Sequence, residues 1–497
     1  MVAAGAVALV LAVPLIFLLL EAAGAHGVAH LIWRPLTGML LWNTVRLTVV
    51  VTALCAVVGT LAAWFVERTD LPGRRVWAVL VVIPFAIPDF VVSFGWVSIT
   101  TWVQGFGGAV LVMTLAVYPL VFLPVAASLR SADPGQEEIA RSLGMGRVRT
   151  FLRVTVGQAR TAILGGCVLV AFVILAEYGA FEILGYRTFT TEIFTELQVF
   201  DIPAASALSL VLVVVGIVVL GGDLALRSRG RPLRSPQRVI RRHRLGRSRV
   251  PVVAGFCALV GLALGVPIGA SIYWVFEGGV HAIAGASVLD AAWHTALYSA
   301  AAAAVSTVLA VPVAILSVRH PGLGSRILVN STYLVLAMPG VVIAFALGYF
   351  AERYAGGFGY QTAPLLVAAY AILFFPLALV GVSAALAHAP ATLEDVGRSL
   401  GYGRLGVFAR VTLPLVGPGV AAAFCLVFLA AVTELTATLL LIPTGVQTLA
   451  TQFWAYEQNL SYGQAAPFAL VIIGIAAVPS YVVSRYFERV PGRAAIR

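Results

Sequence analysis

The sequence predicts an all-α membrane protein with about 12 transmembrane helices, arranged as two parallel six-helix repeats. Three observations support this prediction. Of the 497 residues, 61% are hydrophobic and only 11% are charged. The apolar residues form runs near the roughly 20 residues with which a helix spans a bilayer. A long loop recurs in the two halves of the chain. A soluble enzyme is excluded, because a soluble fold of this length could not cover so much apolar surface.

Twelve apolar runs follow one another along the chain, six on each side of an arginine-rich stretch. Their approximate bounds are 2–20, 43–66, 76–98, 107–129, 161–185, 204–226, 251–275, 293–317, 327–350, 363–388, 417–442 and 466–487. Small residues after the first run could imitate a signal-peptide cleavage site. No basic segment precedes that run, so we expect a retained first helix.

The arginines predict the orientation. All 32 basic residues are arginine, and the net charge is +11. They gather after the second and fourth runs of each half, in the C-terminal tail, and in the stretch 227–249, which holds ten arginines and no acid. Because short basic loops stay in the cytoplasm, we expect both termini there. A basic excess can also indicate nucleic-acid binding, but its position between apolar runs favours membrane topology and no nucleic-acid partner.

The chain contains an internal repeat. We expect a first half at 1–226, a linker at 227–250 and a second half at 251–497. The pair Arg68 and Pro88 matches Arg319 and Pro339 at one common offset. At a slightly longer offset, the loop at about 130–160 matches the loop at about 389–416. The prolines and glycines of the linker are typical of a flexible connector.

Each repeated loop is predicted to form two short helices joined by a glycine elbow. In the first copy, Asp133-Pro134 suits the start of a helix. Glu137 and Glu138 then fall in its first turn, where the helix dipole favours acids. Gly144 and Gly146 are expected to end it. An amphipathic loop that only anchors to lipid headgroups is the alternative, but duplication and glycine spacing favour docking to a cytoplasmic partner.

The pattern Glu-x-x-Ala-x-x-x-Gly, followed by Phe and a hydrophobic-Thr-hydrophobic-Pro ending, resembles the EAA motif of ABC importer permeases. The second copy has Gly397 where the family has Ala, and the first has Gly157 where the family has Pro. The resemblance implies that both loops carry coupling helices, with ATPase-coupling residues Glu137, Glu138, Ala140, Gly144, Glu394, Asp395, Gly397 and Gly401.

The resemblance also implies the type I ABC importer permease fold, in a bacterial inner membrane. The implied partners are two copies of a cytoplasmic ABC ATPase, which would bind the ATP, and an external substrate-binding protein. The segments 176–193 and 433–451 resemble the ferric-iron branch of these permeases. Thiamine and phosphonate importers have similar segments, so thiamine, phosphonate or another small solute are the alternative substrates.

Few ionisable groups fall at membrane depth, where each is costly unless it faces a cavity or a partner. Glu177 and Glu434 occupy equivalent positions in the two halves. With Tyr178 and Asp89 they are candidates for lining the path of a cationic or metal-bearing substrate. The alternative is structural: a hydrogen bond to a neighbouring helix for the glutamates, and a cap on a proline bend for Asp89.

Catalytic function is not expected. A chain without lysine has no Walker A motif, so ATP hydrolysis is expected on a separate chain. An intramembrane enzyme would need a pattern such as HExxH or GxSxG, which is missing. His26 and His30 lie four residues apart but lack an acidic third ligand, so no metal site and no cofactor are predicted in this chain.

A secondary transporter of the major-facilitator kind is the competing interpretation, since it also has six plus six helices in parallel halves. Residues 67–75 faintly resemble the acidic-basic loop of that class. The second copy, at 319–324, is a poor match. That class also gives no reason for two matched long loops.

Overall fold

The computed structural model describes residues 2–24, 32–132, 135–227, 243–279, 285–354 and 359–489. Every named element in these ranges is a helix, and the one extended pairing among them is an isolated bridge between Thr69 and His243. The predicted all-α class is therefore confirmed. The chain divides into two compact units, which we call the N unit (Ala29–Tyr273) and the C unit (Met1–Val28 with Trp274–Arg497).

The N unit holds the helices of the first repeat and the segment that follows the linker. In chain order these are α3 (Pro35–Arg68), α4 (Arg74–Leu80), η1 (Ile83–Ala86), α5 (Asp89–Val97), α6 (Gly105–Val117), α7 (Pro119–Ser131), α8 (Gly135–Ser142), α9 (Arg147–Thr150), the π-helix η2 (Phe151–Thr155), α10 (Val156–Ala176), α11 (Gly179–Ile183), α12 (Phe189–Gln198), α13 (Ile202–Arg227), η3 (Gly246–Ser248), α14 (Arg249–Val260), the π-helix η4 (Gly261–Gly265) and most of α15 (Val266–Gly278).

The C unit holds the first helix of the chain and the second repeat. These elements are α1 (Val2–Gly24), α16 (Ala286–Arg319), α17 (Leu323–Leu336), α18 (Gly340–Tyr354), α19 (Ala363–Leu373), α20 (Phe375–His388), α21 (Ala391–Ser399), α22 (Arg404–Val407), the π-helix η6 (Phe408–Thr412), α23 (Leu413–Val432), α24 (Thr436–Leu441), α25 (Leu449–Gln458) and α26 (Tyr462–Arg489).

The two units pack their helices in the same way. In the N unit, α3, α7 and α10 pack against one another, and α13 packs on α10 and α12. In the C unit, α16, α20 and α23 pack together, and α26 packs on α23 and α25. The repeat seen in the sequence is thus also a repeat of three-dimensional packing.

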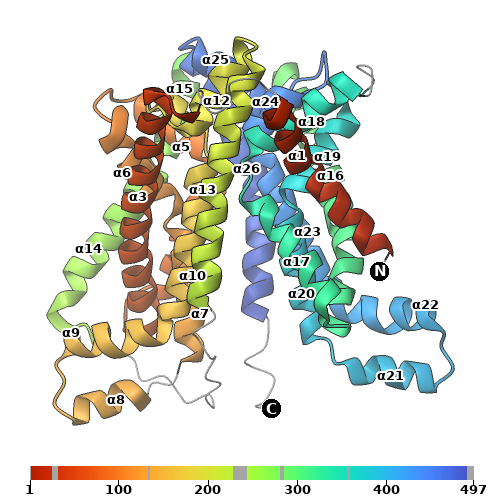
Figure 1. Ribbon diagram of the computed structural model, residues 1–497. Helices are drawn as coiled ribbons and strands as arrows, with labels where there is room; N and C mark the ends of the chain where they lie inside the picture. Colours follow the sequence, from red (N-terminus) through yellow and green to blue (C-terminus); the bar gives the residue numbers. More distant parts are fainter. Residues whose placement is uncertain are drawn as a thin grey trace. The chain divides into compact units, whose positions relative to one another are not determined.

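The first helix of each sequence half packs in the unit built from the other half. α1 packs on α17 and α18 (Figure 1), and the ring of Phe17 lies 6.4 Å from that of Phe345 and 5.6 Å from that of Tyr349. Correspondingly, η4 contacts α6 and η1 within the N unit. The compact units therefore differ from the linear halves by an exchange of these first helices.

Two predicted spans, 76–98 and 327–350, are not continuous helices. The segment Arg74–Ala86 meets α5 at 91°, and α17 meets α18 at 101°. The breaks fall at Pro88 and Pro339, because proline has no backbone N–H and its ring clashes with the preceding helical turn. The predicted span 363–388 also bends, by 56° between α19 and α20.

Eight described helices are long and apolar enough to cross a membrane, or 11 if each bent pair counts as one span. α1 adds a shorter apolar helix, Leu9–Glu21. The predicted spans 161–185 and 417–442 extend too far, since α10 ends at Ala176 and α23 ends at Val432. Glu177 and Glu434 therefore lie just beyond these helix ends rather than inside a continuous span.

Candidate functional site in the two repeated loops

The first repeated loop forms the predicted helix, elbow and second helix. Gly144 follows the end of α8, and its φ of +84° is a left-handed conformation that glycine adopts without strain. Gly144 N–H donates to the carbonyl of Arg141 at 2.9 Å, and Met145 N–H donates to that of Ala140 at 3.0 Å. This pair of bonds is a Schellman motif, which satisfies the last carbonyls of the helix. The predicted start at Asp133-Pro134 lies outside the described residues.

The second repeated loop has the same elbow. Gly401 has a φ of +86° and donates to the carbonyl of Arg398 at 3.0 Å, while Tyr402 N–H donates to Gly397 at 3.2 Å. In Figure 1, α21 and α22 form a hairpin at the lower end of α20 and α23, and α8 and α9 lie likewise below α7 and α10. Both elbows are thus built at equivalent ends of equivalent helices.

A π-helical turn joins each loop to the long helix that follows. The sequences are Phe-Leu-Arg-Val-Thr in η2 and Phe-Ala-Arg-Val-Thr in η6. Isolated π-turns are rare and occur often at functional sites. The sequence predicts the two short helices of each loop but does not indicate a π-turn after the second one.

An arginine at the end of a long helix anchors the first turn of each loop helix. Arg68 of α3 lies 3.8 Å from the carboxylate of Glu137 and donates to the carbonyl of Ala132 at 3.3 Å. Arg319 of α16 lies 2.8 Å from Glu394 and donates to the carbonyl of Ala389, shortly before α21, at 2.9 Å. The sequence repeat relates the two arginines to each other and the two glutamates to each other. It does not indicate that an arginine and a glutamate meet in each loop.

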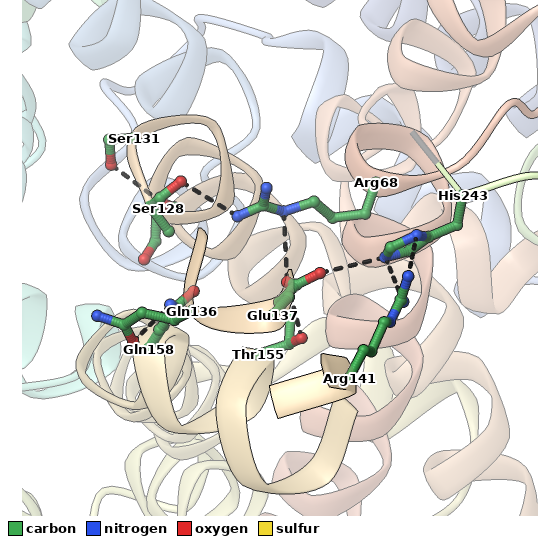
Figure 2. A network of polar contacts seen from close by, with 10 residues as sticks. Arg68, Ser128, Ser131, Gln136, Glu137, Arg141, Thr155, Gln158 and His243 are labelled. Carbon is green, nitrogen blue, oxygen red and sulfur yellow. Dashed lines mark hydrogen bonds and ion pairs between the residues drawn. The ribbon is translucent and has the colours of Figure 1, made fainter. Parts of the chain in front are cut away.

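Glu137 is buried at the centre of a polar cluster (Figure 2). Its Oε1 accepts a hydrogen bond from Thr155 at 2.9 Å, and its Oε2 lies 3.1 Å from Nε2 of His243. Burial raises the pKa of this carboxyl. The hydrogen bond from His243, the charge of Arg68 and the hydrogen bond from Thr155 outweigh burial and hold the pKa below its ordinary value. The carboxylate is therefore charged at neutral pH.

The predicted coupling residues divide between an inner face, which packs against the rest of the unit, and an outer face, which is exposed. Ala140 and Gly397 are buried like Glu137, and Glu394 is half-buried, so these four hold the loop helices to their units. Glu138 and Asp395 are exposed. Both loops also expose apolar side chains, which are Ile139, Leu143, Val148 and Leu152 in the first and Val396, Leu400 and Leu405 in the second.

This outer face is suited to binding a protein partner. Leu143 and Leu400, one residue before each elbow, are 77% and 71% exposed. Contiguous exposed apolar side chains rimmed by charges mark interaction surfaces. The two loops present such side chains at equivalent positions.

Gly397 is a departure from the expected alanine that the packing explains. A methyl group at this position would lie 3.3 Å from Cγ2 of both Val407 and Val411. That spacing is tighter than ordinary van der Waals contact, so the valines would have to shift. The two loops are therefore packed slightly differently at this point.

Glu177 and Glu434 cap short helices. Glu177 Oε1 accepts a hydrogen bond from Ala180 N–H in α11 at 2.7 Å, and Glu434 Oε1 accepts one from Ala437 N–H in α24 at 2.9 Å. Each bond satisfies an amide that has no partner within its own helix. The structural role considered from the sequence is thus present in both units.

The short capped helices pack on the second parts of the broken helices. α11 packs on α5, and α24 packs on α18. A methyl group at Gly340, the first residue of α18, would lie 2.9 Å from Glu434 Oε1. Asp89 holds the equivalent position in α5, so the N unit has an acid where the C unit has a glycine. Tyr178 is buried and stacks on Phe194, with ring centroids 4.3 Å apart.

The described residues contain no metal-binding cluster. No three His, Cys, Asp or Glu side chains gather there as a metal site would require. His26 and His30 lie outside that part of the chain.

Known proteins match the chain along nearly its whole length. The family described as "Binding-protein-dependent transport system inner membrane component" matches twice, at residues 56–229 and 306–493. The chain is 35% identical over 489 residues to the Fe(3+)-transport system permease protein FbpB 2 of Haemophilus influenzae, covering 97% of this chain and 96% of that protein.

Two further relatives differ in how much of this chain they match. The ferric transport system permease protein FbpB of Actinobacillus pleuropneumoniae is 21% identical over 476 residues, which cover 87% of this chain and 68% of that protein. The molybdenum transport system permease protein ModB of Escherichia coli is 30% identical over 226 residues. That match covers 98% of ModB but 42% of this chain, as expected if this chain holds two permease halves.

Proposed function

We propose a function from one premise: the chain belongs to the family of inner membrane components of binding-protein-dependent transport systems. The family matches both repeats, and a full-length relative shares 35% of its residues. The chain is therefore a multi-pass inner-membrane protein and the permease subunit of an ABC importer. The predicted fused, two-half permease is confirmed. The substrate, the coupling sites and the orientation of the termini are proposals.

The proposed substrate is ferric iron, delivered by an external binding protein and moved by ATP hydrolysis on a separate subunit. The full-length similarity to an Fe(3+)-transport permease supports this substrate. Thiamine and phosphonate are the competing solutes from the sequence resemblance. The half-length similarity to ModB, a relative named for molybdenum transport, adds molybdenum as a competitor to test.

The two repeated loops are the proposed sites of ATPase coupling, and we place them in the cytoplasm with both termini. The observation that carries this proposal is the repeated geometry: a Schellman elbow, a π-turn and an arginine–glutamate anchor in each loop. An anchored inner face lets a push on the exposed outer face reach the long helices directly. Two such loops fit two copies of an ATPase.

A metal cargo also gives the intramembrane acids a proposed second role. Each unit carries one glutamate at an equivalent helix break, and the N unit adds Asp89. Carboxylate oxygens suit the transient contact of a cation. In this proposal one oxygen of each glutamate caps the short helix, while the negative charge attracts the substrate.

The test is ATP-driven uptake by the reconstituted complex. The chain would be purified with its bound ATPase, placed in liposomes and supplied with the binding protein. Uptake of radioactive ferric iron, competed by unlabelled ferric iron but not by thiamine, phosphonate or molybdate, is the expected result. Accumulation by the isolated chain on an ion gradient would contradict the proposal and favour a secondary transporter.

A further inference from the structure

The described end of the linker is docked on the first loop rather than free. We call residues 243–248 the docked segment. His243 N–H donates to the carbonyl of Arg68 at 2.8 Å, and the His243 carbonyl accepts from Asp70 N–H at 3.1 Å. Leu245 N–H donates to Asp70 Oδ1 at 2.7 Å. These three bonds fix the backbone of the docked segment to the end of α3, which corrects the prediction of a flexible connector for this part.

The His243 side chain joins two residues of α8. Its Nε2 lies 3.1 Å from Glu137 Oε2, and its Nδ1 and Nε2 lie 3.1 and 2.8 Å from Nη1 and Nη2 of Arg141 (Figure 2). The ring also lies 6.1 Å from that of Trp64 in α3, tilted against it. One imidazole thus links α3 to successive turns of α8.

The two ring nitrogens of His243 have partners of opposite kind, since the carboxylate of Glu137 accepts and the guanidinium of Arg141 donates. With its proton on Nε2, the ring donates to the carboxylate of Glu137 and accepts from Arg141 on Nδ1. A protonated ring would direct a second donor at the guanidinium of Arg141. The site therefore needs a side chain that donates at one end and accepts at the other.

The second loop is held differently within the described part of the C unit. Glu394 pairs with Arg319 at 2.8 Å, a full ångström closer than Glu137 lies to Arg68. Arg398, the equivalent of Arg141, lies instead against Asp395 at 3.0 Å on its own helix. The ion-pair partners of Glu394 among the described residues are Arg319 of α16 and Arg398 of α21.

We propose that His243 is a positioning residue for the first coupling helix, so that the docked segment acts as a strap on α8. This proposal rests on the proposed function in taking α8 as a coupling helix. It makes the two coupling helices unequal: within the described residues, α21 is tied to its unit through the pair of Glu394 and Arg319, and α8 is tied through Arg68 and also through the strap.

Hydrogen exchange on the full-length protein in nanodiscs tests the strap without the ATPase. In His243→Ala, the amides of α8 are expected to exchange about tenfold faster or more, since a hydrogen bond to a charged group is lost. The amides of α21 should not change, which provides an internal control for folding. His243→Gln should restore protection because its amide both donates and accepts, whereas His243→Arg should not.

The ratio of transport to ATP hydrolysis provides the second measurement. With the ATPase bound, His243→Ala should lower the solute transported per ATP hydrolysed, and His243→Gln should recover it. Unchanged exchange in α8 of His243→Ala would overturn the strap, whatever transport does. Faster exchange in α8 together with an ATPase that binds neither loop would leave the strap standing and refute the proposed coupling function.

Discussion

Single carboxylates decide how firmly each repeated loop is held. Glu137 is buried and has three different partners, while Glu394 is half-buried and pairs with Arg319. Removing one partner of a buried ion pair is strongly destabilising, because the other charge stays buried without compensation. The first loop is therefore most sensitive to mutation of Glu137 or its partners, and to acid.

Acid should loosen the first loop through Glu137. The pKa of Glu137 lies below the ordinary value of 4.5. The stabilisation that its carboxylate gives to the first loop is therefore fully present above pH 4.5, and it is lost as the pH falls through the folded-state pKa. Hydrogen exchange of α8 should therefore accelerate below pH 4.5 after correction for intrinsic rates. In Glu137→Gln this acid dependence should vanish, and an unchanged pH profile in that variant would show that another group titrates.

Glu434 allows its cap and its charge to be separated. Glutamine keeps the oxygen that accepts from Ala437 N–H but removes the charge, whereas alanine removes both. If the charge attracts a cationic substrate, Glu434→Gln should reduce uptake about tenfold or more, an effect worth about 1.4 kcal/mol, at an unchanged amount of inserted protein. Full uptake by Glu434→Gln with loss in Glu434→Ala would reduce the residue to a helix cap.

At the scale of elements, the π-turns set the direction of each loop. A π-turn contains one residue more than an α-helical turn, and one residue corresponds to about 100° of rotation. The hairpin of α21 and α22 is therefore turned relative to α23 by the extra residue in η6. The first loop carries the same extra residue in η2. The orientation of both outer faces is therefore set by a π-turn.

Deleting Ala409 should convert η6 to an α-helical turn and misdirect the second loop. The protein should still insert, because α23 is unaffected, but ATPase binding should weaken about tenfold or more on the scale of a lost interface contact. Ala409→Leu is the matched control, since leucine stands at the equivalent position of η2. Normal ATPase binding by the deletion variant, measured by co-purification, would show that the rotation does not matter.

At the scale of the whole molecule, the sequence predicted the helices but not their exchange between units. Composition, arginine placement and the repeat were sufficient for the all-α class and for the loop elbows, because these depend on local residue types. The packing of α1 on α17 and α18 depends on contacts more than 300 residues apart in sequence, as between Phe17 and Phe345. The docking of His243 on Glu137 is likewise a long-range pairing of common residue types.

Transport should depend on both elbows, with each elbow contributing part of the coupling. Gly144 and Gly401 have φ values of +84° and +86°, where a β-branched residue is strained. The double variant Gly144→Val with Gly401→Val should therefore insert normally and lose ATP-driven uptake, while each single variant keeps part of it. Gly146→Val with Gly403→Val is the matched control, because Gly403 has an extended conformation that valine adopts readily and neither glycine has a positive φ. Equal loss of uptake in both double variants would mean that bulk near the elbow matters rather than its left-handed turn, and normal uptake in the first would refute coupling through these loops.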